Sequence, residues 1–90
     1  MEEEMYIRLL ADHIDYPYWR NHTLRPIDVI LNPELYPDIY NKIMDTDLSF
    51  PIDIVINGKK IEIRDEISLL RLIKSWIIVK HKVKVRKFPM

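Results

Sequence analysis

Hydrophobic and polar positions alternate most regularly in the second half of the chain. Residues 52–56 place isoleucine at every second position, and residues 60–64 repeat the alternation with charged residues between. Asn57-Gly58, containing the only glycine, lies between the two segments. Alternation on both sides of an Asn-Gly pair predicts a β-hairpin, with Gly58 as the second residue of a type I′ turn.

The residues after this hairpin have helical spacing. Asp65 is a good helix cap, and an apolar stripe follows it at intervals of three and four residues, which predicts a helix packed on the sheet. Residues 82–88 alternate again and predict a last strand. The stripe consists of Leu69, Leu72, Ile73, Trp76 and Ile77.

The first half has weaker patterns. Residues 3–11 combine helix formers with apolar residues at short helical spacing, and residues 15–26 form an irregular aromatic segment. Residues 26–31 are β-branched and predict a short strand, and residues 34–44 predict a helix with Pro37 near its first turn. The chain, 1–90, is therefore expected to be a single α+β domain with a small mixed sheet, a β-hairpin and two to three packed helices.

Composition excludes several classes of protein. Hydrophobic residues make up 48% of the chain and charged residues 31%, but every apolar run is far below the ~20 residues that a bilayer span needs. The acidic start, Glu2-Glu3-Glu4, does not resemble a secretory signal, and no cysteine is present to form disulfides. A cytoplasmic protein without a membrane partner is expected.

A zero net charge hides an asymmetry between the two halves. Residues 1–47 carry ten acidic and four basic side chains, whereas residues 48–90 carry four acidic and ten basic ones. The opposed halves favour self-association as a dimer, although they could equally neutralise each other within one folded chain. The basic tail is either the solvated face of a terminal edge strand or a phosphate-contacting stripe for nucleic acid. Its cations are Lys80, Lys82, Lys84, Arg86 and Lys87.

Several segments together carry a resemblance to a known family. Phe50-Pro51-Ile52 opens the hairpin, Asp65 follows it, Arg71 lies in the next helix and residues 83–89 close the chain. This order resembles the ParB/sulfiredoxin superfamily, above all its small stand-alone ParB-like domains, over residues 24–89. In that family a Pro-Ile strand leads through a hairpin to an Asp-Gly-x-His-Arg box that opens a helix. The resemblance implies a ParB/sulfiredoxin-like fold, with residues 1–23 as a preceding helix and aromatic loop.

The family's box is altered here. With Arg71 as the box arginine, Leu70 replaces its histidine, and Glu66 stands where the glycine would follow Asp65. The glycine that ends the helix in the family is Val79. In the family the helix start binds a nucleotide's phosphates, so the resemblance implies a nucleotide with Mg²⁺ as ligand. Glu66 places a negative charge at that turn and argues against tight binding. The implied nucleotide-binding residues are Asp65, Ser68, Arg71 and Lys74.

Members of the superfamily act in CTP hydrolysis during DNA partition, ATP-dependent repair of oxidised peroxiredoxin, serine phosphorylation and proposed nuclease reactions. Because the box is altered, we expect weak nucleotide binding and no catalysis. A protein interaction or scaffold module is one alternative, and non-catalytic DNA binding through the basic tail is another.

Other chemistry has little support from residue spacing. The three histidines lack the short pairing of a zinc site, so no metal is expected. His13 lies between Asp12 and Asp15 and could be a general base oriented by a carboxylate, although such a histidine is more often a surface residue. Tyr16, Tyr18 and Trp19 could stack on single-stranded bases if exposed, or could belong to the core.

Overall fold

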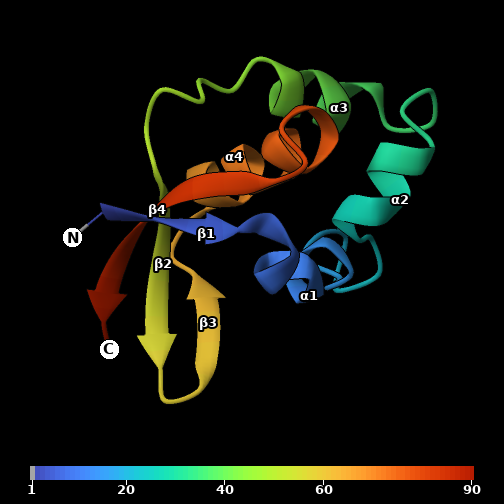
Figure 1. Ribbon diagram of the computed structural model, residues 1–90. Coiled ribbons are helices and arrows are strands. Elements are labelled where there is room, and N and C mark those ends of the chain that lie inside the picture. Colours follow the sequence, from blue (N-terminus) through green and yellow to red (C-terminus); the bar gives the residue numbers. More distant parts are fainter. Residues whose placement is uncertain (1) are drawn as a thin grey trace.

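The centre of the fold is strand β4, Lys82–Pro89, which has a strand on each side. It pairs antiparallel with β1, Glu2–Tyr6, and parallel with β2, Ile52–Asn57. β2 pairs antiparallel with β3, Lys60–Ile63, so the order across the mixed sheet is β1-β4-β2-β3. The computed structural model, which describes residues 2–90, therefore places the first and last strands side by side (Figure 1).

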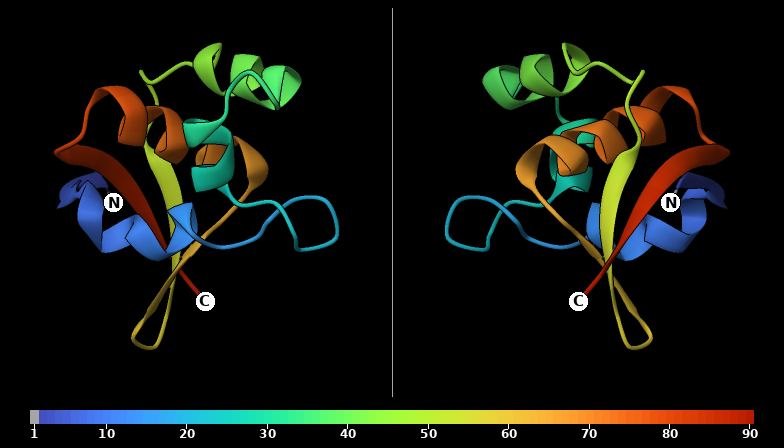
Figure 2. Two further views of the ribbon diagram at one scale, coloured as in Figure 1. Left: turned by 90° about the vertical axis from the view of Figure 1, so that its right-hand side faces the viewer. Right: turned by 90° about the vertical axis from the view of Figure 1, so that its left-hand side faces the viewer.

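Helices occupy the connections between the strands. The 3-10 helix η1, Ile7–Leu10, and helix α1, Ala11–Ile14, follow β1, and α2, Pro26–Leu31, and α3, Pro37–Met44, come before β2. Helix α4, Glu66–Ile78, crosses from β3 to β4 (Figure 2). No helix in residues 2–90 is both long and apolar enough to span a bilayer.

The hydrophobic core lies between the helices and one face of the sheet. Leu72 and Ile73 of α4 are fully buried, as are Ile54 of β2 and Val85 of β4. Leu10 of η1 is fully buried in the same core. Along β4 the positions 82, 84 and 86 are exposed, whereas 83 and 85 are buried, so the other face of this strand is open to solvent.

The hairpin, the long helix and the last strand are confirmed, but two details of them are wrong. The turn is Gly58-Lys59, with Asn57 paired to Lys60, so Gly58 is the first turn residue. Its φ of +62° and the absence of a positive φ at Lys59 fit a type II′ turn better than type I′. The last strand is internal rather than at the edge, because the α4 crossover places it parallel to β2 and β1 covers its other side.

The N-terminal helix predicted over residues 3–11 is wrong in its first half. Residues 2–6 form β1, and helical structure begins only at Ile7. Pairing with the basic strand explains the difference, since Glu2 lies opposite Arg86 and Glu4 lies opposite Lys84. Opposite charges across strands stabilise this pairing, and tertiary contacts override the helix propensity of glutamate.

The strand predicted over residues 26–31 is also wrong, because these residues form α2. Pro26 is at the start of this helix, and the Arg25 main-chain N–H donates to Asp28 Oδ2 at 3.0 Å. Such a cap favours a helix, and a short apolar run does not by itself distinguish a helix from a strand. The next helix begins at Pro37 rather than at residue 34, with proline at a first-turn position that it tolerates.

Gly58→Ala is expected to lower the free energy of unfolding by about 1 kcal/mol, because a left-handed φ is costly for a residue with a Cβ. An added Cβ would meet no atom within 4 Å, so the cost is conformational rather than steric. Gly58→Asn is the matched control and should lose less, since asparagine tolerates this region. Urea unfolding measures both variants, and an Ala variant as stable as the wild type would contradict the turn assignment.

Candidate functional site

The start of α4 is bonded to the sheet. Asp65 caps the helix, since its Oδ1 accepts from the Ser68 main-chain N–H at 2.9 Å. Ser68 is fully buried, and its Oγ accepts from the Asp53 main-chain N–H of β2 at 2.9 Å. Glu66 Oε1 accepts from Trp19 Nε1 at 3.4 Å. Two of the predicted nucleotide-binding residues, Asp65 and Ser68, thus have structural partners within the fold.

The Asp53 side chain, on the opposite face of the sheet, holds two arginines. Arg86 of β4 donates to both carboxylate oxygens, from Nε at 3.1 Å and from Nη2 at 3.0 Å, and Arg64 Nη1 lies 3.6 Å away. Hydrogen bonding to Asp53 raises the pKa of Arg86. Both guanidinium groups also lie over the ring of Phe88, at 4.0 Å for Arg64 and 5.1 Å for Arg86. Arg86 is therefore already neutralised by a carboxylate.

Arg71 and Lys74 hold the link that precedes β2. Arg71 Nη1 donates to the Pro51 carbonyl at 3.2 Å, and Lys74 Nζ donates to the Thr46 carbonyl at 2.7 Å. The Arg71 guanidinium also lies 5.2 Å from the ring centroid of Phe50. Within residues 2–90, Arg71 Nε is the only buried side-chain nitrogen or oxygen atom that has no hydrogen-bond partner.

A small cavity of about 150 Å³ lies beside Arg71, between α4, the link and the first residues of β4. It forms there because β2 pairs with β4 only from Val85 onward, which leaves residues 82–84 free on that side. Its lining residues include three basic residues and two serines but no aspartate or glutamate. We call it the cationic groove, and it is lined by Leu48, Ser49, Phe50, Ile52, Arg71, Ser75, Val79, Lys82, Val83 and Lys84.

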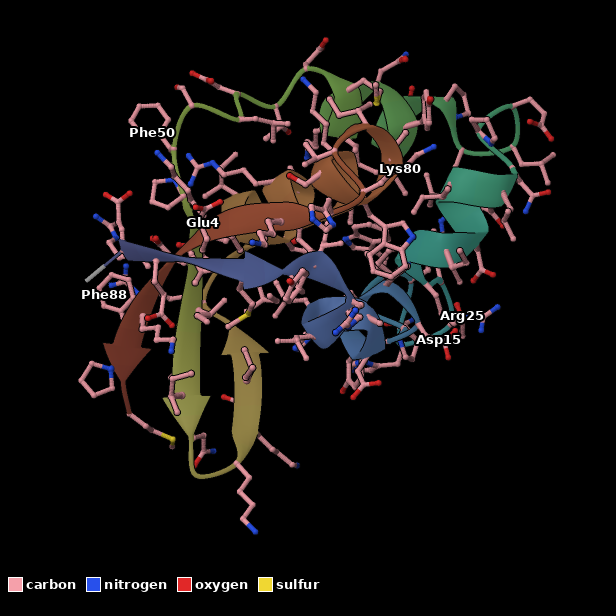
Figure 3. The ribbon with its side chains drawn as sticks, in the orientation of Figure 1. Glu4, Asp15, Arg25, Phe50, Lys80 and Phe88 are labelled. Atoms are coloured by element: carbon pink, nitrogen blue, oxygen red, sulfur yellow. The ribbon has the colours of Figure 1, made fainter. Side chains whose placement is uncertain are left out.

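The basic tail does not form one continuous stripe. Lys82 and Lys84 line the cationic groove, whereas Lys80 and Lys87 do not. Lys80 follows the C-terminal end of α4 with φ +65° (Figure 3), and Lys87 forms an ion pair with Glu3. The structure thus brings Arg71 together with Lys82 and Lys84, two sets of residues that the sequence assigned to different ligands.

A second and larger pocket, of about 620 Å³, lies along β3. Successive side chains of a strand point to opposite faces, so a pocket that touches residues 59–63 in a row must follow the strand's edge. Helical segments and the aromatic loop form its other wall. We call it the edge groove, and it is lined by Leu9, Asp12, His13, Tyr16, Tyr18, Lys59, Lys60, Ile61, Glu62 and Ile63.

His13 and Tyr18 form a hydrogen-bonded pair in this groove. His13 Nε2 lies 2.6 Å from the Ile61 carbonyl, which only accepts, so Nε2 carries the proton. In the neutral imidazole, Nδ1 then accepts from the Tyr18 hydroxyl. Burial, with smaller effects of Tyr16 and Glu62, raises the pKa of Tyr18 to about 12, so the hydroxyl stays protonated at neutral pH.

The carboxylates beside His13 in the sequence do not orient its ring. Asp15 instead pairs with Arg25 at 2.6 Å (Figure 3), and Arg25 also bonds Asp28 at 2.8 Å. Hydrogen bonds from Arg25 lower the pKa of Asp28. Tyr18, the true partner of His13, carried no sequence signal beyond its five-residue separation. In residues 2–90, no three histidine, aspartate or glutamate side chains gather as metal ligands would.

Comparisons of the chain with models of protein families, with curated proteins and with solved structures found no match. What the structure establishes is a mixed α+β fold with a four-stranded mixed sheet and four α-helices in residues 2–90. The ParB/sulfiredoxin relationship rests on the residues quoted for it and stays a proposal.

Ser68→Ala is expected to lower the free energy of unfolding by about 1–3 kcal/mol, because it leaves the buried Asp53 N–H without an acceptor. Ser49→Ala, at an exposed position, is the matched control and should stay within about 0.5 kcal/mol of the wild type. Urea unfolding compares the two variants. Equal stability of Ser68→Ala and Ser49→Ala would show that this hydrogen bond does not hold α4 in place.

Tyr18→Phe is expected to remove a phenol ionisation near pH 12 from the spectrophotometric titration of the folded protein. Because folding raises this pKa above its ordinary 10.0, the stability that the phenol contributes is complete below pH 10 and is lost as the pH rises towards 12. The wild type should therefore lose stability relative to Tyr18→Phe over that interval. An unchanged titration curve in the variant would be inconsistent with the buried, hydrogen-bonded tyrosine.

Proposed function

We propose that this chain is a non-catalytic phosphate-binding domain of the ParB/sulfiredoxin type, which takes a phosphate group in the cationic groove rather than at the start of α4. The buried and unpartnered Arg71 Nε beside that groove carries the proposal. A buried N–H without an acceptor costs free energy, and a phosphate oxygen is an acceptor that an arginine fork binds well.

The charges around the groove favour an anion. Arg71 of α4 and Lys82 and Lys84 of β4 line it, as do Ser49 and Ser75. The ammonium of Lys82 also lies 5.1 Å from the ring centroid of Tyr6. No carboxylate is among the residues that line the groove, but Asp47 accepts from the Ser49 main-chain N–H and Glu4 lies opposite Lys84. A volume of about 150 Å³ suits a phosphate group better than a whole nucleotide, whose base and sugar would lie outside.

The start of α4 is a poorer site for the same ligand. Asp65 already accepts the Ser68 N–H, and the hydroxyl of Ser68 is buried against β2. Glu66 adds a negative charge in the first turn, and Lys74 is bonded to the Thr46 carbonyl. We therefore expect weak binding and no catalysis, in line with the altered box.

Relationship to the superfamily is part of the proposal. The order of hairpin, Asp65-capped helix and closing strand agrees with what the resemblance implies, while the helix at residues 26–31 departs from it. The relationship favours a nucleotide with Mg²⁺ as the source of the phosphate. An interaction module that has lost phosphate binding remains the alternative if the groove binds no anion.

DNA binding through the basic tail has less support, because Glu2 and Glu4 lie opposite Arg86 and Lys84 on the open face.

The expected dimer stays a prediction. Pairing of two copies along the free edge of β1 is disfavoured, since the glutamates of each copy would meet like charges.

Millimolar inorganic phosphate and Mg²⁺-bound ATP or CTP are expected to raise the melting temperature, as any ligand of the folded state does. Lys84→Gln and Lys82→Gln should each weaken phosphate binding about tenfold in calorimetry, the equivalent of ~1.4 kcal/mol. Both lysines are exposed, so neither change should unfold the chain.

Lys42→Gln is the matched control, because it removes the same charge from an exposed position of α3 and should bind phosphate as the wild type does. Equal affinity of all three variants, or no effect of phosphate on the wild type, would contradict the groove as the site. A short DNA duplex tested at two salt concentrations separates the other source of phosphate. Binding to DNA but not to nucleotides, with a steep loss of affinity at high salt, would show that nucleic acid and not a nucleotide supplies the phosphate group.

A further inference from the structure

The outer edge of β3 presents main-chain groups to the edge groove. Arg64 N–H donates to the Asp53 carbonyl at 3.0 Å, and alternate residues of an antiparallel strand share the same direction. The main-chain N–H and C=O groups of residues 60, 62 and 64 therefore point towards β2. Those of Ile61 and Ile63 point outward, away from the sheet. The bond from His13 to the Ile61 carbonyl agrees with this direction.

His13 covers only part of this edge. It occupies the Ile61 carbonyl, and it is the only side chain in residues 2–90 that hydrogen-bonds to the outer edge of β3. The Ile61 N–H and both main-chain groups of Ile63 are left facing the groove. Edge strands with free main-chain groups are templates for pairing with another chain, and proteins usually protect them.

The opposite wall leaves room for a ligand. Leu9 is 58% exposed and Tyr16 is 51% exposed, and the rings of Tyr16 and Tyr18 lie 4.8 Å apart. A volume of about 620 Å³ lies within the range of ~300–1,000 Å³ that is usual for ligand pockets. The hydrogen bond from His13 Nε2 to the Ile61 carbonyl fixes this wall to the strand at that point, and the bond to Tyr18 holds the His13 ring.

We propose that the edge groove binds an extended peptide segment of another protein, which adds a short strand to β3 through Ile61 and Ile63 and places a basic side chain between Asp12 and Glu62. Main-chain hydrogen bonds to a free edge supply affinity in this mode of recognition, and side-chain contacts supply specificity. The site is independent of the phosphate groove.

Charge complementarity selects the basic side chain. Asp12 and Glu62 are exposed carboxylates on opposite walls of the groove, and Tyr16, which is 51% exposed, offers an aromatic ring to a cation. Lys59 and Lys60 lie near the hairpin turn, so they confine the ligand's cation to the part of the groove away from the turn. His13 limits the added strand to a few residues, because it already holds the Ile61 carbonyl.

Two capped pentapeptides, Val-Lys-Val-Lys-Val and Val-Glu-Val-Glu-Val, test the proposal by NMR on the isotope-labelled full chain. The lysine peptide is expected to bind and to slow amide hydrogen exchange at Ile63, whereas the glutamate peptide should bind at least tenfold more weakly. A lysine peptide with an N-methylated central valine should also lose about tenfold, because its central residue can no longer donate a main-chain hydrogen bond to β3.

The double variant Asp12→Asn with Glu62→Gln is expected to weaken binding of the lysine peptide about tenfold. Its matched control is Glu34→Gln with Asp38→Asn, which changes the charge equally at exposed positions outside the groove and should bind as the wild type does. No binding, equal affinity for both charge types, or equal affinity of the N-methylated peptide would overturn the proposal. So would unchanged exchange at Ile63 in the saturated complex.

Discussion

The hydrogen bond from the Asp53 main-chain N–H to Ser68 Oγ is the constraint on which the other features depend. It ties the start of α4 to β2, and both residues are buried. The carboxylate of Asp53 extends from the other face of the sheet to Arg86 of β4 and Arg64 beside β3. One residue thus connects the helix with three neighbouring segments of the sheet, and removing either partner would leave a buried polar group unpaired, at a cost of about 1–3 kcal/mol.

This attachment determines where binding chemistry can occur. Residues at the start of α4 bond to β2 and to the helix itself, so few of their polar groups are available to a ligand. The next turn of the same helix places Arg71 against the link before β2, beside the unpaired side of β4 at Lys82 and Lys84. Cations that line a cavity without a carboxylate among its lining residues are suited to an anion, and here they lie away from the start of α4.

Local patterns predicted the hairpin, α4 and the last strand, because alternation, a cap and an apolar stripe act over a few residues. The first strand was missed because Glu2–Tyr6 is stable as a strand only beside the basic residues of β4, a contact of high sequence separation. The short apolar run of α2 had no distinctive period. Arg71, Lys82 and Lys84 were each identified from sequence, but their placement around one groove requires the strand order. The partnership of His13 with Tyr18 depends on the loop conformation, which no sequence pattern indicated.

Chemical-shift mapping with inorganic phosphate tests the central claim most directly, because it locates the anion as well as detecting it. We expect the largest shifts on Ser49, Arg71, Ser75 and residues 82–84, while the amides of residues 66–68 stay nearly unchanged. Shifts concentrated at residues 66–68, with the cationic groove unaffected, would show that the anion binds at the start of α4 and would contradict the account.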